Sequence, residues 1–222
     1  MNKLLLSAAL VALIPGSAMA QDSVFKKSAG DIMLRGRMVV VAPSENADTT
    51  GAIAGNDLLS IDNSVVPELD LTYFLTDNIA LELIAAVTPH DVDGKGAVAG
   101  VDFGKVWLLP PTLTLQYHFD SIESVGNISP YVGAGVNYTV FFNADDWDTA
   151  TIDDVDYDSS FGGVLQVGVD VPLSENWVLN ADVKKVWINS DVDVTLAGGG
   201  GTVNADVDIN PWLFGVGVGY KF

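Results

Sequence analysis

The amino-acid sequence predicts an all-β fold: an eight-stranded antiparallel transmembrane β-barrel with short periplasmic turns and longer extracellular loops. The mean hydropathy is positive, although 29 acidic residues outnumber 10 basic ones. After residue 20 no apolar run reaches the length of about 18 residues that a membrane helix needs. Apolar residues instead alternate with other residues in segments of about ten positions, which is the pattern of strands with one lipid-facing side.

The first twenty residues have the features of a secretory signal peptide. Lys3 supplies a positive charge, residues 4–14 form a short apolar run, and Ala18-Met19-Ala20 is a small-residue cleavage site. We expect residues 1–20 to be cleaved and residues 21–222 to form one barrel domain. The chain has no cysteine, which excludes disulfides and thiolate sites. Its negative charge excludes a nucleic-acid partner, because phosphate binding needs a basic surface.

Eight alternating segments are separated by connections of two kinds. Three connections are short, and four are long, at residues 42–64, 88–107, 143–160 and 189–210. Short turns at one end and long loops at the other are typical of outer-membrane barrels. The even strand number places both termini at the short-turn end. The predicted strands cover residues 32–41, 65–75, 79–87, 108–119, 130–142, 161–171, 177–188 and 211–222.

One face of these strands is apolar, with aromatic residues toward its ends. In the last strand it carries Trp212, Phe214, Val216, Val218, Tyr220 and Phe222. Such a face is expected against lipid, whereas a soluble barrel would turn its apolar face inward and its charged face outward. The opposite face of this strand carries Gly215, Gly217 and Gly219. Glycine is unfavourable within strands, so these positions are expected to make room for large side chains inside the barrel.

The inward-facing positions form a polar group and an apolar group. Buried charges must be paired, so the polar group is expected to form an ionic plug in the periplasmic half. It comprises Arg35, Arg37, Glu68, Asp70, Glu82, Asp170, Asp182 and Lys184. The apolar group is expected to line a roomier channel above the plug, and comprises Val39, Val41, Ile84, Ala86, Leu108, Val164 and Val186. This layout suits a pocket for a small hydrophobic molecule better than a water-filled pore.

The last strand ends on Phe222, with Tyr220 two positions before it. Strand geometry does not require a terminal aromatic residue, but this ending resembles the signal that the bacterial barrel-assembly machinery reads. Several longer stretches resemble the OmpW family of small outer-membrane barrels, which includes hydrocarbon-uptake members. These stretches are LTDNIALELIAAVTP, LPPTLTLQYHF, PYVGAGVNYTVFF, QVGVDV and the ending NPW…VGVGYKF.

The resemblance covers nearly all of the mature chain. It implies a monomeric barrel in the bacterial outer membrane, surrounded by lipid and lipopolysaccharide, with a narrow apolar channel for the passive passage of small hydrophobic molecules. It places an apolar constriction at Ile84 and a kink at Leu109-Pro110-Pro111. Lys184 departs from the family pattern, in which a large aromatic residue is expected, and we expect it to pair with Asp182, Glu82 or Asp170.

A second interpretation, from a different class, is a closed structural or surface-interaction barrel whose acidic loops bind divalent ions, lipopolysaccharide or external partners. It rests on seven aspartates between Asp145 and Asp158, whose spacing lacks the glycine and the final glutamate of an EF-hand loop. Enzyme activity is not expected, because neither His90 nor His118 has a serine at a neighbouring position on the same face. No cofactor and no metal site are expected.

Overall fold

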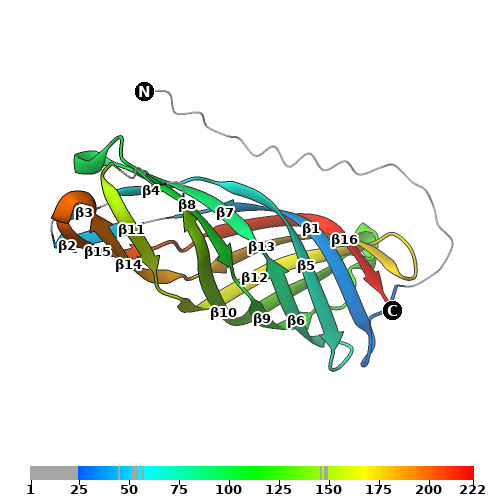
Figure 1. Ribbon diagram of the computed structural model, residues 1–222. Coiled ribbons are helices and arrows are strands. Elements are labelled where there is room, and N and C mark those ends of the chain that lie inside the picture. Colours follow the sequence, from blue (N-terminus) through cyan, green and yellow to red (C-terminus); the bar gives the residue numbers. More distant parts are fainter. Residues whose placement is uncertain (1–24, 45, 52–54, 57, 146, 148–149) are drawn as a thin grey trace.

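The computed structural model describes residues 25–44, 46–51, 55–56, 58–145, 147 and 150–222, so the expected signal peptide lies outside the described residues. Eight strands close into an antiparallel barrel in which strands adjacent along the chain are also adjacent in space (Figure 1). None of the helices in the described ranges is long and apolar enough to cross a membrane. The barrel strands are β1 (Ile32–Ala42), β5 (Ser64–Phe74), β6 (Ile79–Ala86), β9 (Thr112–His118), β10 (Ser129–Asp145), β12 (Ser160–Pro172), β13 (Trp177–Val186) and β16 (Trp212–Lys221).

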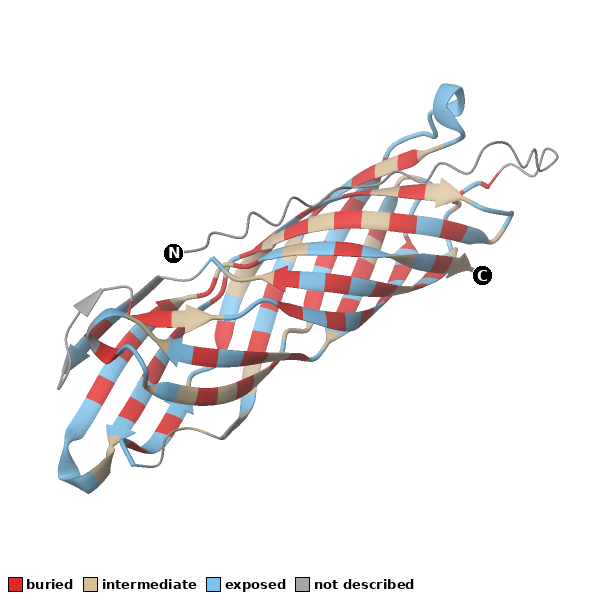
Figure 2. Ribbon diagram, turned by 90° about the horizontal axis from the view of Figure 1, so that it is seen from above, coloured by how far each residue is buried: buried red, intermediate tan, exposed pale blue. Residues whose placement is uncertain are grey.

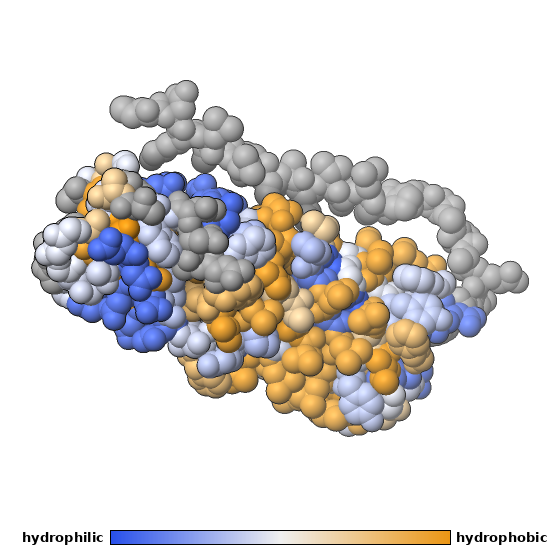
Figure 3. All heavy atoms as spheres, viewed as in Figure 1, coloured by the Kyte–Doolittle hydropathy of each residue, from blue (hydrophilic) through white to orange (hydrophobic). Residues whose placement is uncertain are grey.

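Burial alternates along each barrel strand, as the period-2 pattern predicts. Along β5 buried and exposed residues follow one another without interruption, and the same banding runs around the barrel in Figure 2. The exposed set is apolar, with Leu69 59% and Val216 55% exposed. Figure 3 shows hydrophobic side chains gathered over the barrel strands and hydrophilic ones at the end of the molecule away from the C-terminus. The expected lipid-facing surface is therefore present.

The predicted strand over residues 108–119 is two strands. Residues Leu108 and Leu109 end β8 (Asp102–Leu109), and β9 begins only at Thr112. Pro110 and Pro111 separate them because proline has no N–H to donate to a ladder. Strand β10 pairs with both pieces, since Val140 lies opposite Leu109 and Asn137 lies opposite Thr112. The expected kink is thus a break in the strand.

The four long connections lie at one end of the barrel, as expected, but they are not irregular loops. They contain β2 (Asn46–Gly51), β3 (Gly55–Asn56), β4 (Leu59–Ile61), β7 (Thr88–Gly94), most of β8, β11 (Ile152–Tyr157), β14 (Asn189–Leu196) and β15 (Gly201–Asp208). Strands β11, β14, β15, β2 and β3 form a second sheet, while β8, β7 and β4 extend the first. Together they continue the barrel as an extension at the end away from the C-terminus (Figure 1). Their aspartates face outward, and alternate residues such as Val192 and Val194 are buried.

The other end of the barrel has short connections and both ends of the described chain near it. The Leu75 N–H donates to the Ile79 carbonyl at 2.8 Å, and the Leu173 N–H donates to the Trp177 carbonyl at 2.8 Å. A longer connection carries the 3-10 helix η2 (Glu123–Val125), while η1 (Gly96–Val98) and η3 (Ala197–Gly199) lie in the extension. The first barrel strand pairs with the last, from Met33 opposite Lys221 to Ala42 opposite Trp212, and this pairing closes the wall.

Candidate functional site

Two buried arginines on β1 hold a network of carboxylates across the lower barrel. Arg35 lies 3.1 Å from Asp70 and 3.0 Å from Asp170. Arg37 contacts Glu68 at 2.8 Å, Asp70 at 2.9 Å, Glu82 at 3.2 Å and Asp182 at 2.7 Å. Both arginine side chains are fully excluded from solvent, so these contacts replace the hydration that the charges lose. We call this network the ionic plug.

Lys184 joins the ionic plug at its upper side. Its ammonium lies 2.9 Å from Glu68 and 3.0 Å from Asp182. Asp182 was among the expected partners, whereas Glu68 was not, and the structure gives no ion pair between Lys184 and either Glu82 or Asp170. The difference follows from register, because Lys184 lies two residues above Asp182 on β13 and therefore level with the upper carboxylates. All eight charged residues expected in the plug are brought together.

Sequence reasoning missed a ninth charged residue, Lys27, which precedes the first strand. Its ammonium lies 2.8 Å from the Asp170 carboxylate, from the Ser129 hydroxyl and from Nδ1 of His118. Nearby Phe25 is buried in an apolar cluster with Met33, Phe74, Ala80 and Val178. The segment carrying Phe25 and Lys27 therefore closes the periplasmic mouth. Its only signal in the sequence is an aromatic residue and a lysine two positions apart.

The structure also corrects the expectation that no serine lies near a histidine. Ser129 and His118 meet through Lys27, whose ammonium stands between them. The Ser129 hydroxyl donates to the Phe119 carbonyl at 3.3 Å, and His118 bonds to Gln116 at 2.9 Å through Nε2. The serine and histidine thus lack the direct hydrogen bond that an activated nucleophile needs.

The inward glycines make room for the plug. Gly219 lies opposite Arg35, and a Cβ at this position would come 2.9 Å from Cγ of Arg35. Gly168 makes room for the Tyr131 ring, because a Cβ there would lie 2.7 Å from its Cε1. The Tyr131 ring in turn stacks on His118, with centroids 4.9 Å apart. The large inward side chain of Tyr131 was not recognised in the sequence.

Above the plug lies an apolar cavity, which we call the inner cavity. Its floor carries Lys184 and Glu68, and its apolar wall includes Val39, Val41, Ile84, Ala86, Leu108 and Val186. These are six of the seven residues expected to line a channel. Val164, the seventh, is buried in the neighbouring core but does not border this cavity. The side chain of Ile84 is 4% exposed and lies opposite Asp70 and Thr112.

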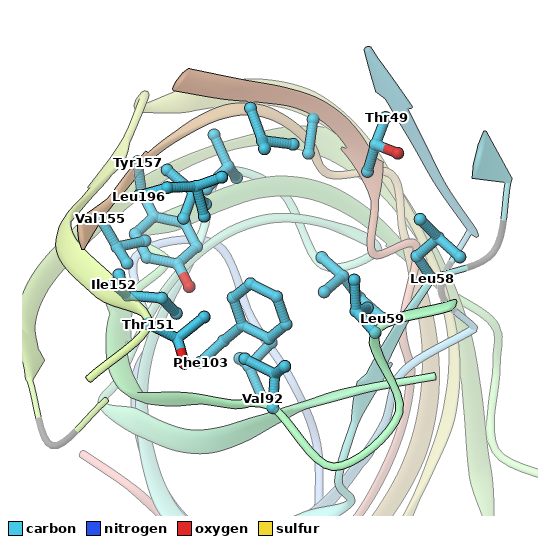
Figure 4. Close-up of a pocket in the computed structure, with 16 residues that line it drawn as sticks. Thr49, Leu58, Leu59, Val92, Phe103, Thr151, Ile152, Val155, Tyr157 and Leu196 are labelled. Carbon is cyan, nitrogen blue, oxygen red and sulfur yellow. The ribbon is translucent and has the colours of Figure 1, made fainter. Parts of the chain in front are cut away.

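Two more apolar cavities continue the inner cavity into the extension. The middle cavity shares His90, Leu108 and Ile209 with the inner one. The outer cavity shares Leu59, Val92, Tyr157 and Val192 with the middle one. Figure 4 shows Phe103, Ile152 and Tyr157 pointing into the outer cavity, Phe103 from β8 and the other two from β11. Shared linings make the three cavities one apolar series from the outer tip to the plug.

The barrel wall beside the inner cavity has an interrupted ladder. Pairing between β6 and β9 ends at Ile84 opposite Thr112, and pairing between β7 and β8 begins at Thr88 opposite Leu108. Residues 85–87 and 109–111 lie between and are not paired with each other. Pro110 lines the inner cavity, while Leu109 is 38% exposed on the outside. We call this place the wall interruption.

The acidic residues of the extension are spread over the outside of its sheet. Asp191 lies opposite Asp206, which in turn lies opposite Asp48. Within the described part of the chain, no group of three or more His, Cys, Asp or Glu residues could hold a metal ion. Asp146 and Asp148 lie outside the described residues.

The last residues of the chain form an aromatic cluster at the periplasmic rim. Tyr220 packs edge-on against Trp177, with ring centroids 5.0 Å apart, and against Phe222 at 4.9 Å. Phe222 is 68% exposed, and its N–H donates to the Ile32 carbonyl at 2.8 Å. The terminal aromatic residue is thus held in the barrel wall with its ring outside, where a partner can reach it.

Comparison with known proteins agrees with this architecture. An outer-membrane protein of Sinorhizobium fredii is 44% identical over 183 residues, which cover 81% of this chain and 75% of that protein. Outer membrane protein W of Vibrio cholerae is 35% identical, with 93% of this chain and 95% of that protein covered. The crystal structure of the outer membrane protein OprG from Pseudomonas aeruginosa superimposes with a TM-score of 0.79 at 29% identity, covering 90% of this chain and 99% of that one. Residues 28–222 match the model of the OmpW family, and the chain therefore belongs to this family of outer-membrane barrels.

Proposed function

We propose that this barrel admits small hydrophobic molecules passively across the outer membrane. The observation that carries the proposal is the series of three apolar cavities, which extends from the outer tip to the ionic plug. Their linings are apolar apart from a few threonines, His90, Asn137, the Tyr157 and Ser190 hydroxyls and the floor of the inner cavity. A hydrocarbon entering them exchanges water for apolar side chains, which is favourable by about 25 cal/mol per Å² of buried surface.

The same arrangement argues against axial exit into the periplasm. Below the inner cavity the path is filled by Arg35, Arg37 and their carboxylates, and below these by Lys27 and Phe25. Separating the buried ion pairs would cost several kcal/mol, because each charge would lose its partners in a dry interior. A hydrophobic molecule also gains nothing by entering a polar network. We infer that it leaves sideways.

The wall interruption supplies the sideways route. There the two strand pairs separate for about three residues on each side, and prolines remove two backbone donors. Opening the wall at this place breaks no ladder hydrogen bonds between residues 85–87 and 109–111. The molecule would pass from the inner cavity past Pro110 into the outer membrane itself, where the surrounding lipid is equally apolar.

A relative supports the class of substrate. The dibenzothiophene metabolism operon protein PahQ of Pseudomonas aeruginosa is 29% identical over 171 residues, covering 77% of either chain. Dibenzothiophene is a compact apolar molecule, which is the chemistry that the cavities of this chain fit. No catalytic step is included in the proposal, because the route needs only a concentration gradient.

The proposal is tested by uptake of a labelled hydrocarbon into cells that carry the wild-type protein, an Ile84→Trp variant, or no protein. Ile84 borders the inner cavity, so the larger indole is expected to slow uptake to the level of cells without the protein. Leu83→Trp is the matched control, because Leu83 is 51% exposed on the lipid side of the same strand. Equal uptake in all cells would overturn the proposal.

The acidic outer sheet favours a second candidate, a surface that binds divalent ions, lipopolysaccharide or an external cationic partner. Like charges directly opposite in a ladder repel, so the row of Asp191, Asp206 and Asp48 gains from bound cations. Replacing Asp191 and Asp206 by asparagine keeps the strands and removes the charge. If surface binding is the function, these changes should impair envelope integrity or adhesion and leave hydrocarbon uptake unchanged.

A further inference from the structure

Two polar side chains that border the apolar inner cavity have unused hydrogen-bonding groups. Thr88 and His90 lie two residues apart on β7 and are 5% and 4% exposed. Thr88 has no side-chain hydrogen bond within the described ranges of the chain, and His90 uses only one ring nitrogen. An occupant that hydrogen-bonds to both groups is favoured over one that places apolar atoms against them, because a polar group that is cut off from water without a partner is costly.

The other polar residues that line the cavity are already engaged. Lys184 and Glu68 pair with each other at 2.9 Å. The Thr112 hydroxyl donates to the Pro110 carbonyl at 2.9 Å, and Asn137 bonds to Thr112 at 2.6 Å. Thr88 and His90 are therefore the polar groups that the described lining leaves for a ligand. Both lie at the upper part of the cavity, where His90 also borders the middle cavity.

The one hydrogen bond of His90 defines which chemical group fits. Its Nδ1 lies 3.0 Å from the Asp62 carbonyl oxygen, which can only accept, so Nδ1 carries the ring hydrogen. A second proton on Nε2 would place a charge among apolar side chains, where it is costly. Nε2 is then a lone-pair acceptor that has no partner among the described residues, on a side chain that lines the inner and middle cavities. The Thr88 hydroxyl can donate or accept.

We propose that Thr88 and His90 form a recognition site for the hydroxyl group of a small apolar alcohol or phenol. This inference rests on the proposed function and narrows its substrate class. The ligand hydroxyl donates to Nε2 of His90 and accepts from Thr88, while its apolar body lies against Val186, Leu108 and Ile84. A plain hydrocarbon leaves both groups unpaired. A carboxylate, which only accepts, cannot bond to Nε2.

The test compares 2-naphthol with 2-methylnaphthalene, which differ by a hydroxyl against a methyl group. Binding to the full-length mature protein in lipid nanodiscs is measured at neutral pH by ligand fluorescence, with empty nanodiscs as the reference for partition into lipid. The wild-type protein is expected to prefer 2-naphthol by about tenfold, which corresponds to about 1.4 kcal/mol. Thr88→Val and His90→Phe should each reduce this preference, and together abolish it.

Two readouts keep a failure of folding apart from a loss of recognition. Affinity for 2-methylnaphthalene should be unchanged or higher in the Thr88→Val and His90→Phe variants, which shows that the cavity has formed. Thr88→Ser retains the hydroxyl and should retain the preference. If the wild-type protein bound both probes with equal affinity after subtraction of partition into empty nanodiscs, the hydroxyl site would be overturned. The proposed function would still stand in that case if Ile84→Trp abolished the binding of both probes. Absence of any interior binding by either probe would overturn both proposals.

Discussion

Gly217 lies directly opposite Arg37 across the pair of β16 and β1, at the level where Arg37 contacts four carboxylates. A Cβ on Gly217 would stand 2.8 Å from Cγ of Arg37 and would also collide with the Gly36 carbonyl oxygen. The ionic plug therefore requires a glycine at this position, because Arg37 can extend into the barrel only when the residue opposite it has no side chain. The repeated glycines of the last strand have a physical reason of this kind.

The variant Gly217→Ala is expected to destabilise the barrel by about 1–3 kcal/mol, the usual range for an overpacked interior. The measurement is urea-induced unfolding in lipid vesicles. Gly36→Ala is the matched control, since a Cβ there meets only Leu69, at 3.9 Å, and faces the lipid side. If Gly217→Ala proved as stable as Gly36→Ala, the assigned packing of Arg37 would be wrong.

Arg37→Met is expected to cost about 3–5 kcal/mol, because it leaves buried carboxylates without their shared cation. Lys105→Met provides the comparison: its side chain is 39% exposed and its partner Asp91 is 3.2 Å away, also exposed. A solvent-exposed pair of this kind contributes at most about 1 kcal/mol. The same unfolding assay compares the two variants. A similar loss of unfolding free energy in both would contradict a plug that is closed to water.

Tyr157 in the extension predicts a dependence of stability on alkaline pH. Burial raises the pKa of its hydroxyl to about 12, above the value of about 10 for an unfolded tyrosine. The stabilisation is complete below pH 10 and is lost as the pH rises from there through 12, since only the unfolded state then releases its proton readily. Ultraviolet titration should show a late-ionising tyrosine that Tyr157→Phe lacks. If the variant instead lacked a tyrosine that ionises at about pH 10, the burial of this ring would be refuted.

The wall interruption predicts a change in rate without a change in binding. Replacing Pro110 and Pro111 by valine restores two backbone donors, so the strand can close against residues 85–87. Uptake of hydrocarbon should slow several-fold, while equilibrium binding to the outer and inner cavities should persist. Loss of binding and uptake together would instead indicate a collapsed cavity. Unchanged uptake would place the exit elsewhere.

The sequence predicted the parts of the fold that depend on strict alternation. The eight barrel strands, the lipid-facing surface and the inward charged set follow from a period of two residues and are found as expected. The extension was missed because its strands carry polar residues, several of them aspartate, at every second position, as in 189–196 and 201–208, and such composition resembles a solvated loop. The buried apolar residues between these polar positions, Val192 and Val203 among them, are the signal that distinguishes such a strand from a solvated loop.

The remaining site residues were missed for reasons of position. Lys27 lies outside any alternating segment, so the sequence does not show whether its side chain points into or out of the barrel. Only the fold brings it to Asp170. His90 was assigned to the start of a loop next to Asp91, although it lies in β7 and is buried. Residue spacing cannot reveal that one ring nitrogen of His90 is bonded while the other is free. That fact needs the backbone of Asp62, 28 residues away in sequence.

Photolabelling can show whether hydrophobic molecules enter the barrel interior. Cells are exposed to a short alkyl probe that bears a diazirine, irradiated, and the purified protein is mapped by mass spectrometry. We expect adducts on inner-cavity residues such as Val39 and Val186, which excess unlabelled hydrocarbon and the Ile84→Trp substitution should both remove. Labelling of the lipid-facing Leu69 should stay constant. Adducts confined to the lipid-facing surface would contradict entry into the barrel interior.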